Sequence, residues 1–402
     1  MRISWKNPIT TAMKRSISAL AVIFALLVIF ARDAVACTTF CLKNKGEVLF
    51  GKNYDWSIGD GAVFVNRRGV SKWSTIDGEK NTAKWTSKYG SVTFNQYGWE
   101  SPSGGMNEAG LAIELMWLDD TKYPAPDSRP SINVLEWIQF NLDTAANTAE
   151  VIANSEKVRI VSRVNLHYLV NDKQGNSATI EFLNGKLAAH TGNKLPVATL
   201  TNDTYERSLK YSQMAPPART ESSLDRFARA STRTMEFASQ SKTEKEAVDY
   251  AFGILSDVAQ KNSTQWSIVY DQKRGKIYFR TRKESAIKYV DTTAFDYSCS
   301  APVKIFDMNS PADGNVSHRF RDMTRQANRD LIERAFSGTD FLRGVPATAR
   351  DQIAALPETF PCGSKLPLVT PEPKHIATSI AGLGVLDVVF PLFYFCKKIA
   401  AS

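Results

Sequence analysis

A cysteine at a signal-peptide cleavage pattern is the residue of this sequence best suited to covalent chemistry. Cys37 directly follows Ala34-Val35-Ala36, and small residues at alternate positions are typical of a signal-peptidase site. Cleavage after Ala36 would give Cys37 a free α-amine in addition to its thiol. Because an α-amine has a reference pKa of ~8, it can accept the thiol proton at neutral pH. Cys37 would then be both nucleophile and base, without a histidine.

The residues before Cys37 have the other properties of an export signal. Basic residues between Arg2 and Arg15 precede an apolar run over residues 17–30, which is shorter than the ~20 residues of a membrane span. We therefore predict that residues 1–36 are removed and that the protein is exported, to the periplasm or the medium. Two alternatives stay open. One is an uncleaved anchor helix, and the other is a lipoprotein, in which lipidation would block the amine.

The charge and the cysteines limit the partners and cofactors. The net charge is +9, and the sequence has no Lys/Arg-rich run, so we expect no nucleic-acid partner. No spacing of cysteines and histidines is typical of a metal site, so we expect no metal. Cys37 and Cys41 would lie ~13 Å apart on one strand, too far for a disulfide. A bridge between Cys299 and Cys362 stays open.

Short strands and amphipathic helices must position these residues. We predict strands over 38–42, 47–52, 62–66, 91–95, 111–118, 166–171, 178–183, 197–201, 266–271 and 276–280. We predict helices over 131–142, 148–155, 223–237 and 243–260, the last with a capping-box pattern at Thr243 and Glu246. Turn residues lie at 44–46, 172–176 and 272–275, of which the last two indicate hairpins, and Gly104-Gly105 is typical of a turn. This order of elements favours an α+β fold in which helices cover antiparallel sheets.

The chain changes in character after about residue 300. Residues 319–336 are charged with a helical pattern, and prolines recur beyond them. Residues 376–395 form a second apolar run of membrane-span length, but Asp387 and Pro391 interrupt it. We therefore divide the chain into a signal peptide over 1–36, a main domain over 37–345 and a proline-rich extension over 346–402. Whether 376–395 contacts a membrane or docks on the domain stays open.

Five motifs, in sequence order between Cys37 and residue 280, resemble those of one family. They are Cys37-Thr38-Thr39 with Gly51-Lys52-Asn53-Tyr54-Asp55-Trp56, Gly105-Met106-Asn107-Glu108-Ala109-Gly110-Leu111, Leu200-Thr201-Asn202, Asp225-Arg226-Phe227 and Ser263-Thr264-Gln265-Trp266-Ser267. The chain resembles the choloylglycine hydrolase family of N-terminal-nucleophile hydrolases, which contains bile salt hydrolases and penicillin V acylases. The resemblance implies a four-layer αββα sandwich of antiparallel sheets. It also implies an exported hydrolase of linear amide C–N bonds that needs no cofactor, with penicillin V, N-acyl homoserine lactones or conjugated bile salts as small acyl-amide substrates.

The same resemblance assigns roles by matched position. Cys37 is expected to be the nucleophile, Asp55 to hold its α-amine, and Asn202 to donate its side-chain amide to the oxyanion. Arg226 is expected to favour the thiolate through its positive charge. Lys52 stands where the family usually has arginine, so it keeps the charge but lacks the planar fork.

Two tryptophans are the expected walls of the substrate pocket. Trp56 directly follows Asp55. Trp117 corresponds to the family's second oxyanion residue, often Asn or Tyr, and an indole cannot replace an amide donor, so a backbone N–H should serve there. We expect Trp56 and Trp117 to contact an aryl or fatty acyl group, although large aromatic residues are also common in cores.

Other interpretations stay open. A Cys37–His167 dyad would be a different enzyme mechanism, but no third member lies near His167 in the sequence, which favours a packed strand residue. A catalytically inactive protein of the same fold, associated with the envelope, would bind a partner instead. The subunit number is open and includes a homo-oligomer. The segment between Asn202 and Arg226 is too short for the tetramerisation loop that bile salt hydrolases carry there.

Overall fold

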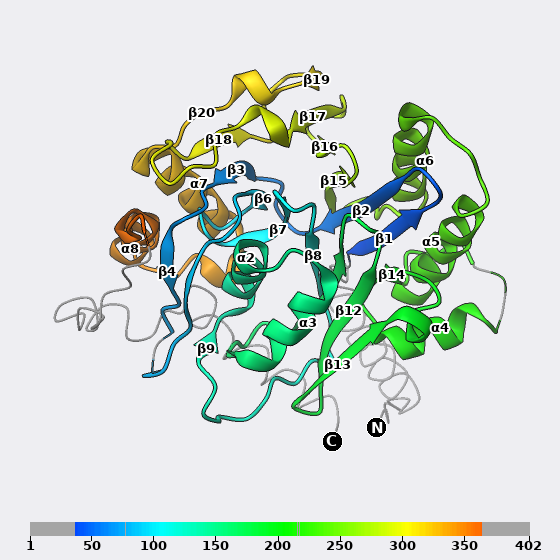
Figure 1. Cartoon of the computed structure of the whole chain (residues 1–402), viewed down its shortest axis with the longest axis horizontal. Helices are drawn as coiled ribbons and strands as arrows, with labels where there is room; N and C mark the ends of the chain where they lie inside the picture. The colour runs from blue at the N-terminus through cyan, green and yellow to red at the C-terminus, as the bar shows by residue number, and fades with distance from the viewer. Residues whose placement is uncertain (1–36, 77, 215, 217, 364–402) are drawn as a thin grey trace, which may run out of the picture. The chain divides into compact units, whose positions relative to one another are not determined.

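Two large β-sheets form the centre of the structure, a computed structural model that describes residues 37–76, 78–214, 216 and 218–363 (Figure 1). Helices lie against both sheets. The predicted signal peptide over 1–36 and the apolar run over 376–395 lie outside the described residues.

The first sheet carries the N-terminal hairpin. Its strand order is β14-β1-β2-β15-β16-β17-β19, and neighbours are antiparallel except β17 and β19, which are parallel. The strands are β14 (Thr199–Leu200), β1 (Thr38–Lys43), β2 (Val48–Asp55), β15 (Thr264–Asp271), β16 (Lys276–Thr281), β17 (Lys288–Asp291) and β19 (Gly314–Asn315). Because Thr38 pairs with Asn53, the start of β1 lies beside the end of β2. This register brings Cys37 and Asp55 to the same end of the hairpin.

The second sheet is antiparallel throughout its described strands. Its order is β13-β12-β11-β8-β7-β6-β3-β18-β20. The strands are β13 (Lys186–Thr191), β12 (Ser177–Leu183), β11 (Leu166–Asn171), β8 (Ala112–Trp117), β7 (Pro102–Asn107), β6 (Ser91–Asn95), β3 (Ala62–Asn66), β18 (Lys304–Asp307) and β20 (Arg321–Asp322). Two short pairs lie outside both sheets: β4 (Ser71–Trp73) with β5 (Lys84–Thr86), and β9 (Ser131–Ile132) with β10 (Arg159–Ile160).

Aromatic side chains fill the space between the two sheets. The ring centroid of Tyr270 on β15 lies 5.8 Å from that of Phe50 on β2 and 6.1 Å from that of Phe94 on β6. Phe94 also lies 5.6 Å from Phe279 on β16. Of these strands, β2, β15 and β16 belong to the first sheet and β6 belongs to the second. The contacts therefore show that the two sheets pack face to face. Each buried ring of this kind contributes ~1.5–3 kcal/mol to the hydrophobic stabilisation of the fold.

Helices cover the outer faces of the two sheets (Figure 1). The first sheet contacts α5 (Ser223–Phe237) and α6 (Glu244–Asp257), and the second contacts α2 (Val134–Thr144) and α3 (Thr148–Lys157). The layers are therefore helix, sheet, sheet and helix, which is the αββα sandwich that the sequence predicts. The capping box of Thr243 and Glu246 at the start of α6 is also confirmed.

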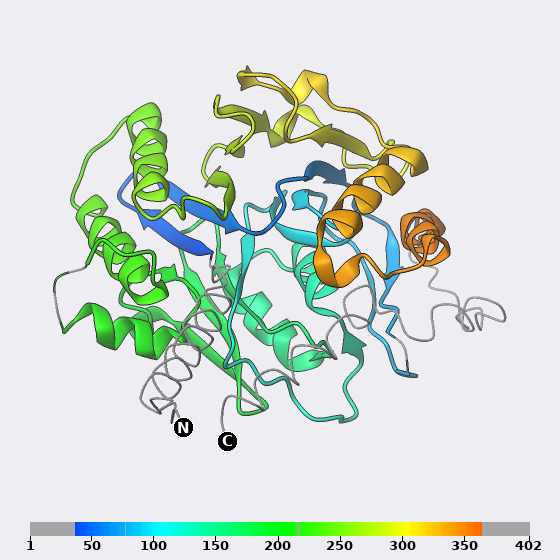
Figure 2. The same cartoon turned by 180° about the vertical axis from the view of Figure 1, so that it is seen from behind.

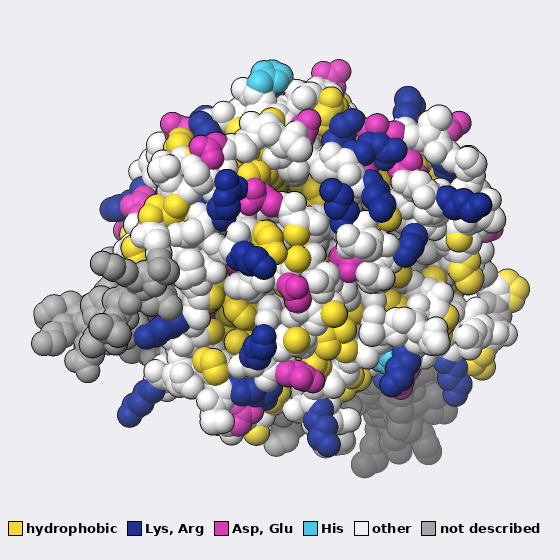
Figure 3. Space-filling model, viewed as in Figure 1, with side chains coloured by type: hydrophobic (Ala, Val, Ile, Leu, Met, Phe, Trp, Pro, Cys, Tyr) yellow, Lys and Arg dark blue, Asp and Glu magenta, His cyan; other side chains and the backbone are white. Residues whose placement is uncertain are grey.

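The remaining helices lie in the connections and in the last described part of the chain. They are α4 (Tyr205–Ser212), α7 (Arg325–Gly338) and α8 (Ala347–Ala355). Figure 2 shows α7 and α8 in orange, packed beside each other. No helix in the described ranges combines the length and apolar character that crossing a bilayer requires. On the face in Figure 3, Lys and Arg side chains are spread over the surface with Asp and Glu between them.

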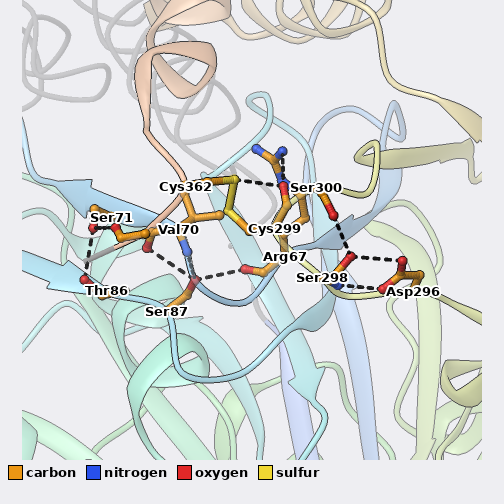
Figure 4. The surroundings of a disulfide bond; sticks show 11 residues. Arg67, Val70, Ser71, Thr86, Ser87, Asp296, Ser298, Cys299, Ser300 and Cys362 are labelled. Atoms are coloured by element: carbon orange, nitrogen blue, oxygen red, sulfur yellow. Dashed lines mark hydrogen bonds between the residues drawn. A yellow bond between two sulfur atoms is a disulfide. The ribbon is translucent and has the colours of Figure 1, made fainter. Parts of the chain in front are cut away.

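A disulfide between Cys299 and Cys362 fixes the last described residues (Figure 4). Cys362 forms a β-bridge with Val70, and the Ser71 N–H donates to the Pro361 carbonyl at 2.9 Å. A bond across a separation of 63 residues corresponds to ~4 kcal/mol in the chain-entropy model. The pairing that the sequence left open is thus present, whereas Cys37 and Cys41 are free and buried.

The predicted strands and helices are present with shifted ends, but two local predictions are wrong. Residues 131–132 form β9 instead of the start of a helix, because Asn133 caps α2 and forms a capping box with Glu136. The charged helix α7 is among the elements with shifted ends, since it begins at Arg325 after the N-cap Thr324.

The second error concerns Gly104 and Gly105, which lie inside β7 and not in a turn. A Cβ at position 104 would lie 2.2 Å from Cδ of Glu114 on the neighbouring strand β8. Glycine at 104 therefore leaves the space that the buried Glu114 carboxylate occupies. The turn comes after β7, between Asn107 and Gly110, where Gly110 has a φ of 82°.

Candidate active site

Cys37 lies at the start of β1 with only 4 % of its surface exposed. Its Sγ lies 4.0 Å from the backbone carbonyl oxygen of Asp55. Burial raises the pKa of the thiol, while the charges of Lys52 and Arg226 lower it. Cys37 is therefore a protected thiol with two cations near enough to favour its ionised form.

Asp55, the last residue of β2, is fully buried close to Cys37. Its Oδ1 accepts a hydrogen bond from the Thr264 hydroxyl. Its Oδ2 has no hydrogen-bond partner among the described residues. Burial raises the pKa of this carboxyl group to about 6, although Arg226, Thr264 and Lys52 each lower it. The site thus contains a buried carboxylate oxygen that lacks a donor.

Arg226 links the helix layer to the start of β1. It lies in α5, is fully buried, and its Nη1 donates to the Cys37 carbonyl at 2.7 Å and to the Thr38 hydroxyl at 2.6 Å. Its Nη2 donates to Asn202 Oδ1 at 3.0 Å. The guanidinium therefore holds the backbone of Cys37 and the side chain of Asn202 at fixed positions.

Asn202 follows β14 and connects the two sheets. Its Nδ2 donates to the Trp117 carbonyl at 2.8 Å, and its backbone N–H donates to Ser223 Oγ at 2.9 Å. Together with the Arg226 contact, these bonds fix both the backbone and the amide group of Asn202. The structure thus brings Cys37, Asp55, Asn202 and Arg226 together, as predicted from the motifs.

Lys52 is also buried and has a partner that the sequence analysis missed. Its Nζ donates to the Leu115 carbonyl and lies 3.7 Å from Glu114 Oε2. The other oxygen of Glu114 accepts from the Tyr270 hydroxyl at 2.5 Å. Burial raises the pKa of Glu114 to about 7. A lone glutamate in the apolar segment 111–118 is the sequence signal that could have identified Glu114.

The two tryptophans flank the site at different strand ends. Trp56 is half-buried, and its ring lies 6.4 Å from Phe341 in an edge-on arrangement. Trp117, at the end of β8, is half-buried, and its Nε1 donates to Asp119 Oδ1 at 2.8 Å. Phe341 is an aromatic residue beside Trp56 that sequence reasoning did not find, because it lies 285 positions along the chain from its partner.

His167 does not pair with Cys37. Its Nδ1 lies 3.2 Å from Glu181 Oε1, and its Nε2 lies 2.7 Å from the Thr201 carbonyl oxygen. Both ring nitrogens are therefore occupied, which argues against a Cys37–His167 dyad. Among the residues with described coordinates, no group of three His, Cys, Asp or Glu side chains could hold a metal ion.

A separate cleft of about 840 Å³ lies at the other end of β1. Cys41, Lys43 and Thr234 are among its lining residues, whereas Cys37 is not. Burial raises the pKa of the Cys41 thiol to about 12, so this thiol stays protonated at neutral pH. The lining of this cleft contains none of the predicted site residues, which gather at the Cys37 end of the hairpin.

Known proteins resemble this chain in sequence and in structure. Residues 37–214 match the model of linear amide C–N hydrolases of the choloylglycine hydrolase family. A curated relative, a penicillin V acylase of Pectobacterium atrosepticum, is 29% identical over 262 residues, which cover 54% of this chain and 69% of the relative.

Solved structures extend the match over more of the chain. The penicillin V acylase of Agrobacterium tumefaciens has a TM-score of 0.63 and 30% identity, and the match covers 72% of this chain and 98% of the acylase. A variant of the conjugated bile acid hydrolase of Clostridium perfringens, with a TM-score of 0.58 and 18% identity over 69% of this chain and 98% of its own, shows the shared fold. The chain therefore belongs to the choloylglycine hydrolase family and is a hydrolase of carbon–nitrogen bonds in linear amides.

Proposed function

We propose that the protein is an exported acylase in which cleavage after Ala36 makes Cys37 an N-terminal nucleophile. The observation that carries this proposal is the buried Oδ2 of Asp55, which has no hydrogen-bond partner among the described residues. A free α-ammonium group on Cys37 would supply the donor and the positive charge that this oxygen lacks. Without it, the buried carboxylate costs free energy that the fold does not recover.

The proposed reaction uses the two groups of Cys37 in turn. The α-amine accepts the thiol proton, and the thiolate attacks the amide carbonyl of the substrate to form a tetrahedral intermediate. The protonated amine then gives its proton to the leaving nitrogen, so the C–N bond breaks and an acyl thioester remains. Water, deprotonated by the same amine, attacks the thioester and releases the acid and the free thiol.

Asn202 is the proposed oxyanion donor. Its amide nitrogen carries two hydrogens, of which one is bound to the Trp117 carbonyl. The second hydrogen is available to the substrate oxygen. Because Arg226 and Trp117 hold the amide before the substrate arrives, no reorganisation is needed when the oxyanion forms.

The aromatic residues support an acyl group with an aryl ring or an alkyl chain. Trp56 and Phe341 form one apolar wall. Trp117 lies next to Asn202, because its backbone carbonyl accepts the hydrogen bond from the Asn202 side chain. Aromatic walls bury large apolar surfaces. Penicillin V is the first substrate to test because two relatives are penicillin V acylases. N-acyl homoserine lactones follow, and conjugated bile salts come next.

The test of this proposal is the mature N-terminus together with amide hydrolysis. We expect mass spectrometry of the exported protein to give a chain that begins at Cys37 with an unmodified amine. The same sample should release phenoxyacetate from penicillin V. A mature chain that begins elsewhere, or a lipidated Cys37, would exclude the mechanism. Correct cleavage without hydrolysis of any acyl amide would instead favour the inactive binding protein.

Lys52 and Glu114 should shift the pKa of the Cys37 thiol in opposite directions. Lys52→Met removes a positive charge that lowers the thiol pKa, so the alkylation rate of Cys37 should rise only at higher pH. Glu114→Gln removes the negative charge 3.7 Å from Lys52, so the profile should shift to lower pH. Lys52→Arg keeps the charge and should keep the wild-type profile. Identical profiles for wild type and Lys52→Met would contradict the role of Lys52, leaving Arg226 and the α-ammonium as the activating cations.

A further inference from the structure

We infer that His167, oriented by Glu181, is a positioning residue for the oxyanion donor Asn202. The inference rests on the proposed role of Asn202 and extends it to a buried pair that does not contact Cys37. His167 lies on β11 and Glu181 on the neighbouring strand β12, and both are fully buried. The two side chains form a unit behind the turn that carries Asn202.

The partners of His167 determine which ring nitrogen donates to the backbone. Nδ1 faces Glu181 Oε1 at 3.2 Å, and Nε2 faces the Thr201 carbonyl oxygen at 2.7 Å. A carbonyl oxygen only accepts hydrogen bonds. Nε2 of His167 must therefore donate to the Thr201 carbonyl.

Glu181, which lies against His167, also contacts the start of a helix. Its Oε1 also accepts the backbone N–H of Tyr205 at 3.0 Å, and Tyr205 is the first residue of α4. The start of a helix carries a partial positive charge that stabilises a carboxylate. On the other side, His190 Nδ1 lies 3.7 Å from Glu181 Oε2, and His190 Nε2 lies 3.6 Å from Glu206. Glu181 Oε1 thus contacts His167 on β11 and the start of α4, whereas its buried Oε2 has no hydrogen-bond partner among the described residues.

The hydrogen bond from His167 fixes the peptide that precedes Asn202. The Thr201 carbonyl belongs to the peptide group whose N–H is that of Asn202, and this N–H donates to Ser223 Oγ. Arg226 and Trp117 then hold the Asn202 side chain. His167 is the donor to the carbonyl side of this peptide. A shift of ~1 Å in an oxyanion donor is enough to lower a rate ~10²-fold.

Two amide substitutions separate positioning from packing. Glutamine can place its Nε2 near the position of the histidine Nε2, so His167→Gln should keep the bond to Thr201. Asparagine is shorter and can reach only toward Glu181, so His167→Asn should lose it. We expect kcat to fall less than ~5-fold in His167→Gln and ~10- to 100-fold in His167→Asn, with KM changed less than ~3-fold.

Alkylation of Cys37 by iodoacetamide is the second measurement. If His167 had only a structural role, the alkylation rate and kcat would fall together. Alkylation forms no oxyanion, so its rate should equal the wild-type rate in both variants. His190→Asn is the matched control, because His190 lies near the same glutamate without contacting Thr201. This control should keep the wild-type kcat.

The outcomes distinguish this inference from the proposed function. Asn202→Ala should lower kcat ~10²- to 10³-fold. If Asn202→Ala were as active as wild type, the oxyanion role would fail and the inference with it. If Asn202→Ala lost activity while His167→Asn did not, only the inference would be overturned. A loss of alkylation in His167→Asn that matched its loss of kcat would assign His167 to folding and overturn the inference as well.

Discussion

Cys37→Ser is expected to lower the rate of amide hydrolysis at least ~10³-fold while the fold stays intact. A serine hydroxyl is far less acidic than a thiol, so the α-amine can ionise only a much smaller fraction of it. The charges of Lys52 and Arg226, which act against the effect of burial on the thiol pKa, cannot compensate for this difference. The measurement is kcat/KM for penicillin V, with circular dichroism to verify folding.

Cys41→Ser is the matched control for this substitution. Cys41 is the other free and buried cysteine, on the same strand. Because burial raises its pKa to about 12, it has no thiolate to contribute at neutral pH. Cys41→Ser should therefore keep the rate within ~3-fold of wild type, apart from a small loss of stability. Near-normal turnover in Cys37→Ser would place the nucleophile elsewhere in the chain.

Asp55→Asn is expected to remove most of the activity and to abolish the effect of pH on stability that the buried carboxyl group causes. An amide cannot hold the α-ammonium by charge, so the base of the reaction loses its orientation, and kcat should fall ~10²-fold or more. The stability effect depends on the N-terminus. In a chain that keeps Ala36, Cys37 has no α-ammonium group to add to the charges of Arg226 and Lys52 near the buried Asp55 carboxylate.

The direction of the pH effect follows from the raised pKa of Asp55. Its folded value of about 6 lies above the ~3.9 of an unfolded aspartate. The stabilising effect of its protonated form is therefore complete below pH ~4 and is lost as pH rises through about 6, at a total cost of ~2–3 kcal/mol. In a chain that begins at Cys37, the α-ammonium group should offset much of this loss of stability.

Urea unfolding of the two chains at pH 4 and pH 7 measures this difference. The chain that begins at Cys37 and the chain that keeps Ala36 should have similar free energies of unfolding at pH 4. At pH 7 the chain that begins at Cys37 should be more stable. Asp55→Asn should abolish the difference between the two chains. Equal stability at pH 7 in the wild-type pair would show that the α-amine does not contact Asp55.

Local sequence patterns predicted the elements that carry the site. The strands β1 and β2 and the turn between them were predictable from local sequence, whereas the register that places Asp55 beside Cys37 comes from the structure. The start of α6 was predictable because its capping box lies within four residues. These features depend on short-range interactions, which a single sequence contains.

The partners across the sheets could not be predicted in the same way. Arg226 is 189 positions from Cys37, and only the family resemblance suggested that they meet. Glu114 and Glu181 were missed because their partners, Lys52 and His167, lie on other strands. Local periodicity does not predict how strands pair beyond hairpins. Gly104 was misjudged for a related reason, since its lack of a side chain leaves room for Glu114 on the next strand.

Gly104 leaves space for the Glu114 side chain. The effect of a substitution at either position therefore depends on which residue already occupies the other, and so on the order of the two substitutions. Gly104→Ala alone would force the Glu114 carboxylate away from its present place, because the added Cβ would lie 2.2 Å from Cδ of Glu114. After Glu114→Ala, the same change at 104 would meet no carboxylate. The two positions should therefore show strong epistasis. An evolving or engineered lineage could shorten residue 114 first and then enlarge residue 104, whereas the reverse order would pass through a damaged intermediate.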